Sequence, residues 1–259
     1  MLLAIDIGNT NITLGVWNGR CWQNVWRLRT AHERTADEYG IMLTNLLREA
    51  NLLHTITHII MSSVVPALTL PFKELSQTYL NLEVLTVGPE LKMNIRVTTD
   101  NPKEVGADRI VNAAAAYHLT MGPSITIDMG TATTFDVVSG DGALVGVAIA
   151  PGLRLASDAL AARAAQLSQV PLEAPPHAIG RNTVQAVQSG LIFGYVALVE
   201  GMVTRIKKEH PDQGQPIHII GTGGLINILQ PHTDIFDTVD PWLTLTGLRV
   251  INESVRGKL

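Results

Sequence analysis

Cysteine is almost absent from this chain, since Cys21 is the only thiol among 259 residues. A single cysteine excludes an internal disulfide, and its sequence neighbours supply no base that would activate it. Charged residues are also scarce at 16%, and the net charge of −4 gives no electrostatic reason to expect nucleic acid as a partner. These shortages are compatible with a reducing compartment and with small molecules as partners.

Long apolar runs are lacking too, because no stretch of about 18 residues is free of polar interruption. The opening Met1–Thr10 segment has neither the basic start nor the long apolar core of a signal peptide. We therefore expect a cytoplasmic protein that has no membrane partner. Hydrophobic residues nevertheless make up 46% of the chain, which is enough to bury one large core or two modest ones.

The clearest internal pattern is a repeated acidic strand end that is followed by a small polar turn. Ile5–Asn9 reads IDIGN and Ile127–Thr131 reads IDMGT, so the two aspartates lie 122 residues apart. Each copy follows a nearly all-apolar strand and precedes further strands that are joined by tight turns. The order strand, acidic turn, strand, turn, strand thus occurs twice, which indicates duplication of a domain-sized unit.

Helical patterns alternate with these strands, so the sequence predicts an α/β protein. Thr35 and Glu38 have the spacing of a capping box that would begin the first helix. The predicted helices cover residues 35–51, 104–120, 153–166 and 183–209, and further buried strands cover residues 56–61, 84–87 and 216–220.

The two acidic turns have the chemistry of a phosphate-binding site. Glycine lets the backbone come near a ligand, and successive N–H groups with Asn and Thr side chains can hold phosphate oxygens. A carboxylate beside such a turn can orient Mg²⁺ against the same phosphates. A lone copy would more often be an ordinary hairpin turn, but a third glycine cluster follows at Gly221–Gly224. The three features in this order predict nucleotide binding.

This arrangement resembles the acetate kinase, sugar kinase, Hsp70 and actin superfamily, and within it the type III pantothenate kinases over nearly the whole chain. The strings that carry the resemblance are Asp6–Asn11, Gly106–Arg109, Asp128–Thr133, Ala150–Gly152 and Gly180–Thr183. The resemblance implies two duplicated ribonuclease-H-like domains of the actin-like ATPase type, with a nucleotide cleft between them. We place these domains at residues 1–115 and 116–259.

The resemblance also implies a reaction, in which ATP phosphorylates pantothenate to 4′-phosphopantothenate at the first step of coenzyme A biosynthesis. Asp108 would be the base, Asp6 would lie near Mg²⁺, and Asp128 would bind a monovalent cation, either potassium or ammonium. The residues implied to contact ATP are Asp6, Ile7, Gly8, Asn9, Thr10, Asn11, Ile12, Thr13 and Thr131. Those implied to bind pantothenate are Gly106, Ala107, Asp108, Arg109 and Thr183, the last from the partner subunit of a homodimer.

Several alternatives stay open on the residues alone. Asp108–Arg109 could be a surface helix pair that only forms a salt bridge. The fold could serve another kinase of the superfamily, acting on a sugar or an acetate-like acid, or a nucleotide-binding regulator. Two positions depart from the family pattern, since Thr99 stands where an aromatic residue is common and Val147 where a glycine is common. His54 and His58 have the spacing of helical zinc ligands, but the residues between them favour a strand.

Overall fold

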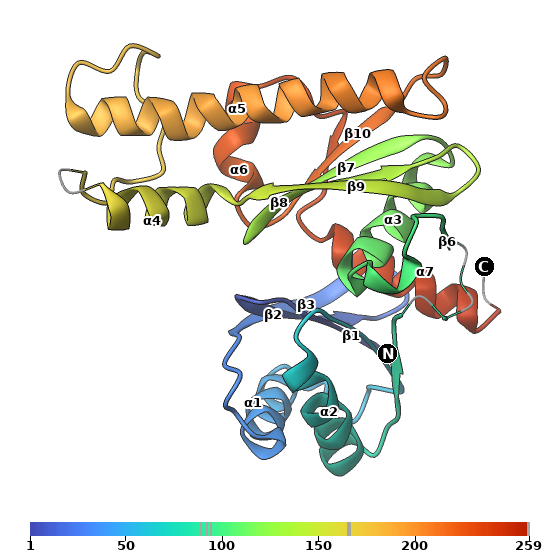
Figure 1. Ribbon diagram of the computed structural model, residues 1–259. Helices are drawn as coiled ribbons and strands as arrows, with labels where there is room; N and C mark the ends of the chain where they lie inside the picture. Colours follow the sequence, from blue (N-terminus) through green and yellow to red (C-terminus); the bar gives the residue numbers. More distant parts are fainter. Residues whose placement is uncertain (89, 92, 94, 165–166, 258–259) are drawn as a thin grey trace. The chain divides into compact units, whose positions relative to one another are not determined.

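The computed structural model describes residues 1–88, 90–91, 93, 95–164 and 167–257. The chain divides into two compact units, of which one comprises Met1–Ala115 with Thr244–Leu259 and the other Ala116–Leu243. Figure 1 shows a separate sheet in each unit. Buried hydrophobic residues form a core in each of them.

The first unit is built on a five-stranded sheet in the order β3-β2-β1-β4-β5. Its strands are β1 (Leu2–Ile7), β2 (Asn11–Trp17), β3 (Trp22–Arg29), β4 (His58–Ser63) and β5 (Val84–Thr86). Neighbouring strands in the β1 to β3 part are antiparallel, whereas β1, β4 and β5 run parallel. Almost every residue of β1 is buried, which explains its nearly continuous apolar sequence.

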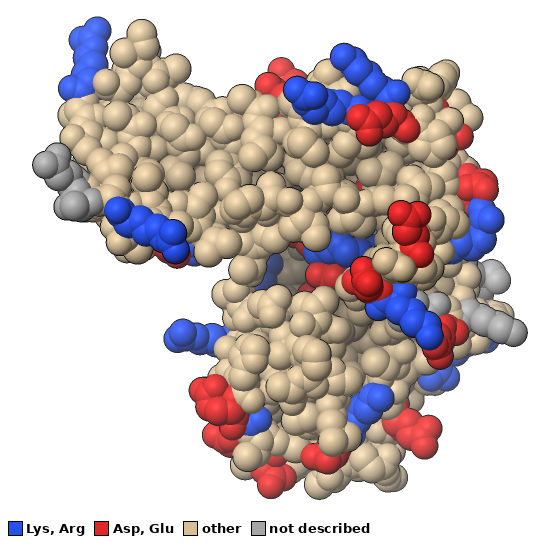
Figure 2. Space-filling view, viewed as in Figure 1, with Lys and Arg blue, Asp and Glu red and all other residues tan. Residues whose placement is uncertain are grey.

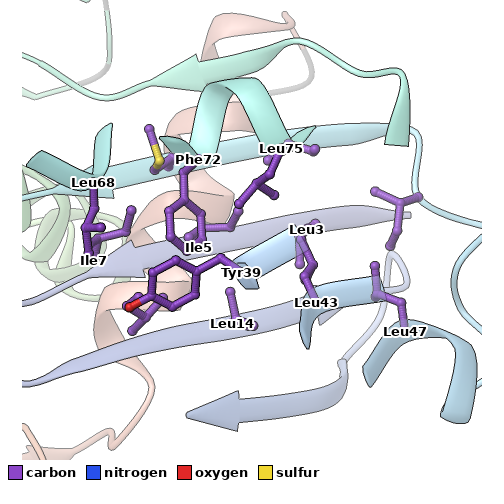
Figure 3. Packing of buried hydrophobic residues seen from close by; sticks show 14 of the residues in the cluster. Leu3, Ile5, Ile7, Leu14, Tyr39, Leu43, Leu47, Leu68, Phe72 and Leu75 are labelled. Carbon is purple, nitrogen blue, oxygen red and sulfur yellow. The ribbon is translucent and has the colours of Figure 1, made fainter. Parts of the chain in front are cut away.

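Two helices, α1 (Ala36–Glu49) and α2 (Pro66–Leu75), pack on this sheet. The Thr35 hydroxyl accepts the Glu38 N–H while the Glu38 carboxylate accepts the Thr35 N–H, so the predicted capping box is confirmed. Figure 3 shows side chains of both helices against those of the strands. The labelled residues are Tyr39, Leu43 and Leu47 from α1, Leu68, Phe72 and Leu75 from α2, and Leu3, Ile5, Ile7 and Leu14 from β1 and β2.

Two further helices pack against each other although they are far apart in the sequence. α3 (Ala107–Thr120) begins later than predicted, because the 3₁₀ turn η2 (Pro102–Glu104) precedes it. The last helix, α7 (Leu243–Val255), packs against α3: the Thr244 hydroxyl donates to Asn112 Oδ1 over 2.9 Å, and any Cβ at Gly247 would overlap the Val111 carbonyl. Residues 244–259 thus group with the first unit, which differs from the predicted domain of residues 116–259.

The second unit repeats the sheet of the first. Within this unit the strand order is β11-β10-β7-β8-β9, which is the order of β5 to β3 in the first sheet. The strands are β7 (Ser124–Met129), β8 (Ala132–Val138), β9 (Ala143–Pro151), β10 (His218–Thr222) and β11 (Thr238–Val239). The β7 to β9 part is again antiparallel and β7, β10 and β11 are parallel. The predicted duplication in an α/β fold is therefore confirmed.

Helices α4 (Leu153–Arg163), α5 (Thr183–Glu209) and the short α6 (Ile226–Leu229) belong to this unit. The predicted end of the fourth helix, residues 165–166, lies outside the described residues. By length and composition α5 could span a membrane, since an 18-residue window has a mean hydropathy of 1.5. Core helices meet the same two criteria, and the buried residues of α5 pack in the core of the second unit. The short elements η1 (Ser76–Leu80), β6 (Arg96–Val97) and η3 (Gln230–His232) complete the chain.

Candidate active site

The first predicted phosphate loop is the turn between β1 and β2. The Gly8 N–H donates to the Asn11 carbonyl oxygen over 3.0 Å and closes the turn. Thr30, at the end of β3, braces it: the Thr30 hydroxyl donates to the Gly8 carbonyl over 2.7 Å, and the Thr30 N–H donates to the Thr10 carbonyl over 3.0 Å. Asn9, Thr10 and Asn11 are exposed on this braced turn. The turn thus exposes polar groups on a backbone that the hydrogen bonds of Thr30 hold in place.

Asp6 is half-buried on β1, next to this turn. Its Oδ1 accepts a hydrogen bond over 2.8 Å from the hydroxyl of Ser62, which is fully buried on β4. The register of the two parallel strands pairs Asp6 with Ser62 directly. The sequence carries no signal for this contact, because a serine inside an apolar strand belongs to no motif. A carboxylate oxygen at this position is the kind of ligand that Mg²⁺ binds.

The string Gly106–Arg109 forms the start of α3. The Asp108 carboxylate is held at both oxygens: Oδ1 accepts the Arg109 backbone N–H and Oδ2 accepts Arg109 Nη2, each over 2.8 Å. A Cβ at Gly106 would lie 2.6 Å from Asp108 Oδ1, so glycine is needed for the carboxylate to fold back over the helix start. The side chain of Asp108 is 24% exposed and that of Arg109 is 12% exposed. The salt bridge therefore exists, but it is more enclosed than a pair on an open helix surface.

Val64 brings the helix start and the first phosphate loop to the same part of the first unit. The Val64 N–H donates to the Ile7 carbonyl oxygen over 3.0 Å, next to the phosphate turn. On its other side, Val64 Cγ1 lies 3.4 Å from the place that a Cβ of Gly106 would take. The two parts of the site that the sequence predicted separately thus flank one residue at the end of β4.

The second predicted phosphate loop is the turn between β7 and β8, and it is closed like the first. The Gly130 N–H donates to the Ala132 carbonyl oxygen over 3.0 Å. Asp128 lies at the end of β7, as Asp6 lies at the end of β1, and Gly223 covers it with φ +97°. A Cβ at Gly223 would lie 2.5 Å from Asp128 Oδ1 and 2.5 Å from the Met129 nitrogen. Gly223 of the predicted glycine cluster therefore forms a cradle of bare backbone against the Asp128 carboxylate.

A second glycine, Gly152, supports the same loop from the start of α4. The Gly152 N–H donates to the Thr131 carbonyl oxygen over 3.1 Å, and a Cβ here would lie 2.6 Å from the Gly130 carbonyl oxygen. The hydroxyl of Tyr195 on α5 donates to the preceding Pro151 carbonyl over 2.8 Å. Burial raises the pKa of Tyr195 further above its ordinary value of 10.0, so loss of this donor by ionisation is disfavoured even in alkaline solution. The sequence did not identify this support, because it joins segments that are far apart in the chain.

Thr183 is the first residue of α5 and is exposed. The Asn182 side chain caps the helix by accepting the Gln185 N–H over 2.9 Å. Gly180 packs so closely that a Cβ there would lie 2.6 Å from Ala186 Cα. The string Gly180–Thr183, whose Thr183 is predicted to reach the substrate, is thus a tightly closed helix start within the second unit.

Comparison with known proteins identifies the family of this chain. The family model described as "Type III pantothenate kinase" matches residues 2–205. The Type III pantothenate kinase of Moorella thermoacetica is 46% identical over 254 residues, which cover 98% of this chain and 99% of that protein. The corresponding protein of Geobacter sulfurreducens is 46% identical over 257 residues, covering 99% and 100%. The chain belongs to the type III pantothenate kinase family.

Solved structures of proteins with low sequence identity share the fold of this chain over nearly its whole length. A protein from Campylobacter jejuni described as a "conserved putative Baf family transcriptional activator" matches with a TM-score of 0.63 at 19% identity, over 98% of this chain and 99% of that one. Component A of (R)-2-hydroxyglutaryl-CoA dehydratase from Acidaminococcus fermentans matches with a TM-score of 0.55 at 11% identity, over 99% and 98%. At such identities these likenesses bear on the fold alone.

Two positions of this type III pantothenate kinase chain depart from the pattern expected for the family. Thr99 is partly buried, and its hydroxyl has no hydrogen-bond partner within the described part of the chain. Val147 lies on β9 opposite Asp136 of β8, where its side chain continues a regular strand. The sequence favoured a strand between His54 and His58, and His58 is indeed the first residue of β4. The two histidines therefore do not share a helix face.

Proposed function

We propose that this chain transfers the γ-phosphoryl group of ATP to the primary hydroxyl of pantothenate and so forms 4′-phosphopantothenate, the first step of coenzyme A biosynthesis. The observation that carries the proposal is the string Gly106–Arg109 at the start of α3, in a chain that matches a type III pantothenate kinase over 98% of its length. We place the reaction in the cytoplasm, as expected for an enzyme that consumes ATP and a soluble vitamin.

Both phosphate loops fit the cations that we propose for them. Asp6 offers a half-buried carboxylate beside a turn rich in donors, and this donor set suits Mg²⁺ bound with ATP. Asp128 lies in the backbone cradle of Gly223, which suits a larger and weakly polarising ion such as potassium or ammonium. When bound, these cations would neutralise charge on the phosphates, which is the main requirement of phosphoryl transfer.

The remaining chemistry falls to residues of the chain. Residues 6–13 and Thr131 hold the phosphates of ATP through backbone N–H groups and side-chain hydroxyls and amides. Asp108 accepts the proton of the substrate hydroxyl as the new P–O bond forms, because a free alkoxide is too basic to exist at neutral pH. Arg109 both restrains Asp108 and offers a cation for the pantothenate carboxylate.

We also propose a homodimer, in which Thr183 of the partner subunit contacts pantothenate. α5 supports this idea, since Gly190, Gly194, Ala197 and Gly201 are exposed at spacings of four, three and four residues and so share one helix face. Each of these glycines has nothing within 4 Å of where its Cβ would be. Figure 2 shows few charged side chains over much of α5. Light scattering should give twice the chain mass of 28.0 kDa, and a mass of 28.0 kDa would refute the dimer.

The proposed function is tested by coupled ADP release with ATP and Mg²⁺, measured with and without pantothenate in sodium and then in potassium buffer. Release that depends on pantothenate and rises with potassium is the expected result. Release that depends instead on a sugar or a short carboxylic acid would assign another kinase activity to the fold. No release with any acceptor, together with tight ATP binding, would indicate a nucleotide-binding regulator.

A further inference from the structure

Ser62 stands out because it is a fully buried polar residue that the proposed mechanism does not yet use. Its hydroxyl donates to Asp6 Oδ1 over 2.8 Å, and the parallel register of β1 and β4 places the two residues side by side. A hydrogen bond to a carboxylate is stronger than one between neutral groups. The contact therefore holds one oxygen of Asp6 firmly and so sets the direction of the other.

The residues that follow Ser62 have different contacts. The Ser63 hydroxyl accepts the Val65 N–H over 3.2 Å and the Thr69 hydroxyl over 3.1 Å, so it stabilises the start of α2. Val64 lies between the end of β1 and Gly106. Of the two neighbouring serines, Ser62 is the one whose hydroxyl donates to the Asp6 carboxylate, so it is the one that can influence a metal–nucleotide complex.

We propose that Ser62 is a positioning residue for the Mg²⁺–ATP complex, which it orients through Asp6. This inference rests on the proposed function only in assigning a nucleotide-bound metal to Asp6. Without the serine hydroxyl, the Asp6 carboxylate loses the hydrogen bond that restrains its Oδ1. Partners that hold a ligand carboxylate typically change metal affinity by about 10- to 100-fold when they are removed.

A purely structural serine would behave differently. Loss of a buried hydrogen bond lowers stability wherever it occurs, but it changes metal affinity only if the bonded group binds the metal. Ser76 offers a matched control, since it is also a fully buried serine in the first unit, and its hydroxyl donates to the Phe72 carbonyl over 2.7 Å. Ser76→Ala also removes a buried serine hydroxyl, but that hydroxyl bonds to α2 and not to Asp6 or the phosphate turn.

The experiment measures binding of Mn²⁺, as a paramagnetic substitute for Mg²⁺, to the full chain with saturating non-hydrolysable ATP analogue. Electron paramagnetic resonance reports free Mn²⁺ directly, so this readout needs no turnover. For Ser62→Ala we expect the Mn²⁺ Kd to rise at least about 10-fold. We expect Ser76→Ala to stay within about 2-fold of the unaltered chain, and Ser62→Thr, which keeps the hydroxyl, to recover most of the affinity.

Steady-state kinetics provide a second readout that separates the outcomes. The KM for Mg²⁺ should rise in Ser62→Ala while the KM for pantothenate stays within about 2-fold. An unchanged Mn²⁺ Kd in folded Ser62→Ala, or an equal loss in Ser76→Ala, would overturn the positioning role. If Mn²⁺ affinity depends on Ser62 but no variant phosphorylates pantothenate, the positioning role stands and the proposed reaction fails.

Discussion

Replacing Gly152 by alanine should disable the second phosphate loop without unfolding the protein. The new Cβ would lie 2.6 Å from the Gly130 carbonyl oxygen and 2.7 Å from the Thr131 carbonyl carbon, whereas carbon–oxygen contacts are relaxed at about 3.3–3.6 Å. All of these obstructing atoms are backbone, so no side chain can rotate to relieve the overlap. The loop must therefore move by roughly 1 Å, or the Gly152 N–H must release Thr131.

Both the stability and the catalytic effect can be estimated from this displacement. Overpacking of this kind costs about 1–3 kcal/mol, and each kcal/mol lowers Tm by about 2–4 °C in a chain of this size. Misplacement of a phosphate-binding loop by about 1 Å costs about 100-fold in activity. We expect kcat/KM for ATP to fall by that factor in Gly152→Ala while a cooperative thermal transition persists.

Gly146→Ala is the matched control for this prediction. It makes the same chemical change on β9, at a glycine whose Cβ would meet nothing within 4 Å. We expect its kcat/KM for ATP and its Tm to match those of the unaltered chain. Coupled ADP release and thermal denaturation measure both quantities. A Gly152→Ala protein with kcat/KM within 2-fold of the Gly146→Ala protein would refute the idea that Gly152 supports the loop.

Three further predictions concern single ionisable groups. Asp108→Asn should lower kcat by about 10²- to 10⁴-fold while the ATP Kd stays within about 2-fold, as measured by turnover and calorimetry; unaltered turnover would remove Asp108 from the base role. Asp128→Asn should abolish the stimulation of kcat by potassium over sodium, and persistent stimulation would place the cation elsewhere. Buried His210 should make the protein acid-sensitive. Burial lowers its pKa from the ordinary value of 6.5, so the unfolded state binds the proton more readily, and the free energy of unfolding is highest above pH 6.5 and falls below it. Urea titrations at pH 7.5 and 5.5 should show this fall in the unaltered chain and a smaller one in His210→Gln; equal falls would contradict it.

The structure around His210 explains the direction of that last effect. Its Nε2 lies 3.2 Å from the Val138 carbonyl oxygen, while its Nδ1 accepts the Asp212 N–H over 3.0 Å. The neutral tautomer that donates from Nε2 satisfies both contacts. Burial lowers the pKa of His210 and outweighs the contact with Val138 and the Asp212 carboxylate, 3.8 Å from Nδ1, which both favour the protonated form.

Sequence reasoning reached most of the fold because the duplicated unit repeats its local signals. The two acidic turns follow apolar strands and precede hairpins, and these signals are sufficient to predict both halves of the α/β architecture. α7 could not be placed in the same way. It is grouped with the first unit by contacts such as that of Thr244 with Asn112, which connects residues 132 positions apart and leaves no periodic pattern.

In the candidate site, too, local sequence patterns predicted some residues, whereas residues that depend on distant contacts were missed. Asp6, Asp128 and the string Gly106–Arg109 could be predicted because glycine and aspartate interrupt apolar patterns at strand and helix ends. Ser62 and Tyr195 could not, since their roles depend on strand register and on helix packing. The sequence therefore predicts the groups that would touch ligands more readily than the groups that hold them in place.

Transfer of the terminal phosphoryl group is tested most directly with ATP that carries ¹⁸O on its γ-phosphate. The protein, Mg²⁺, potassium and pantothenate are incubated together, and the products are resolved by mass spectrometry. The account predicts 4′-phosphopantothenate with the labelled phosphoryl oxygens, formed in step with ADP. Labelled inorganic phosphate without phosphorylated pantothenate would show that the chain hydrolyses ATP and does not use pantothenate as acceptor, which would contradict the proposed reaction.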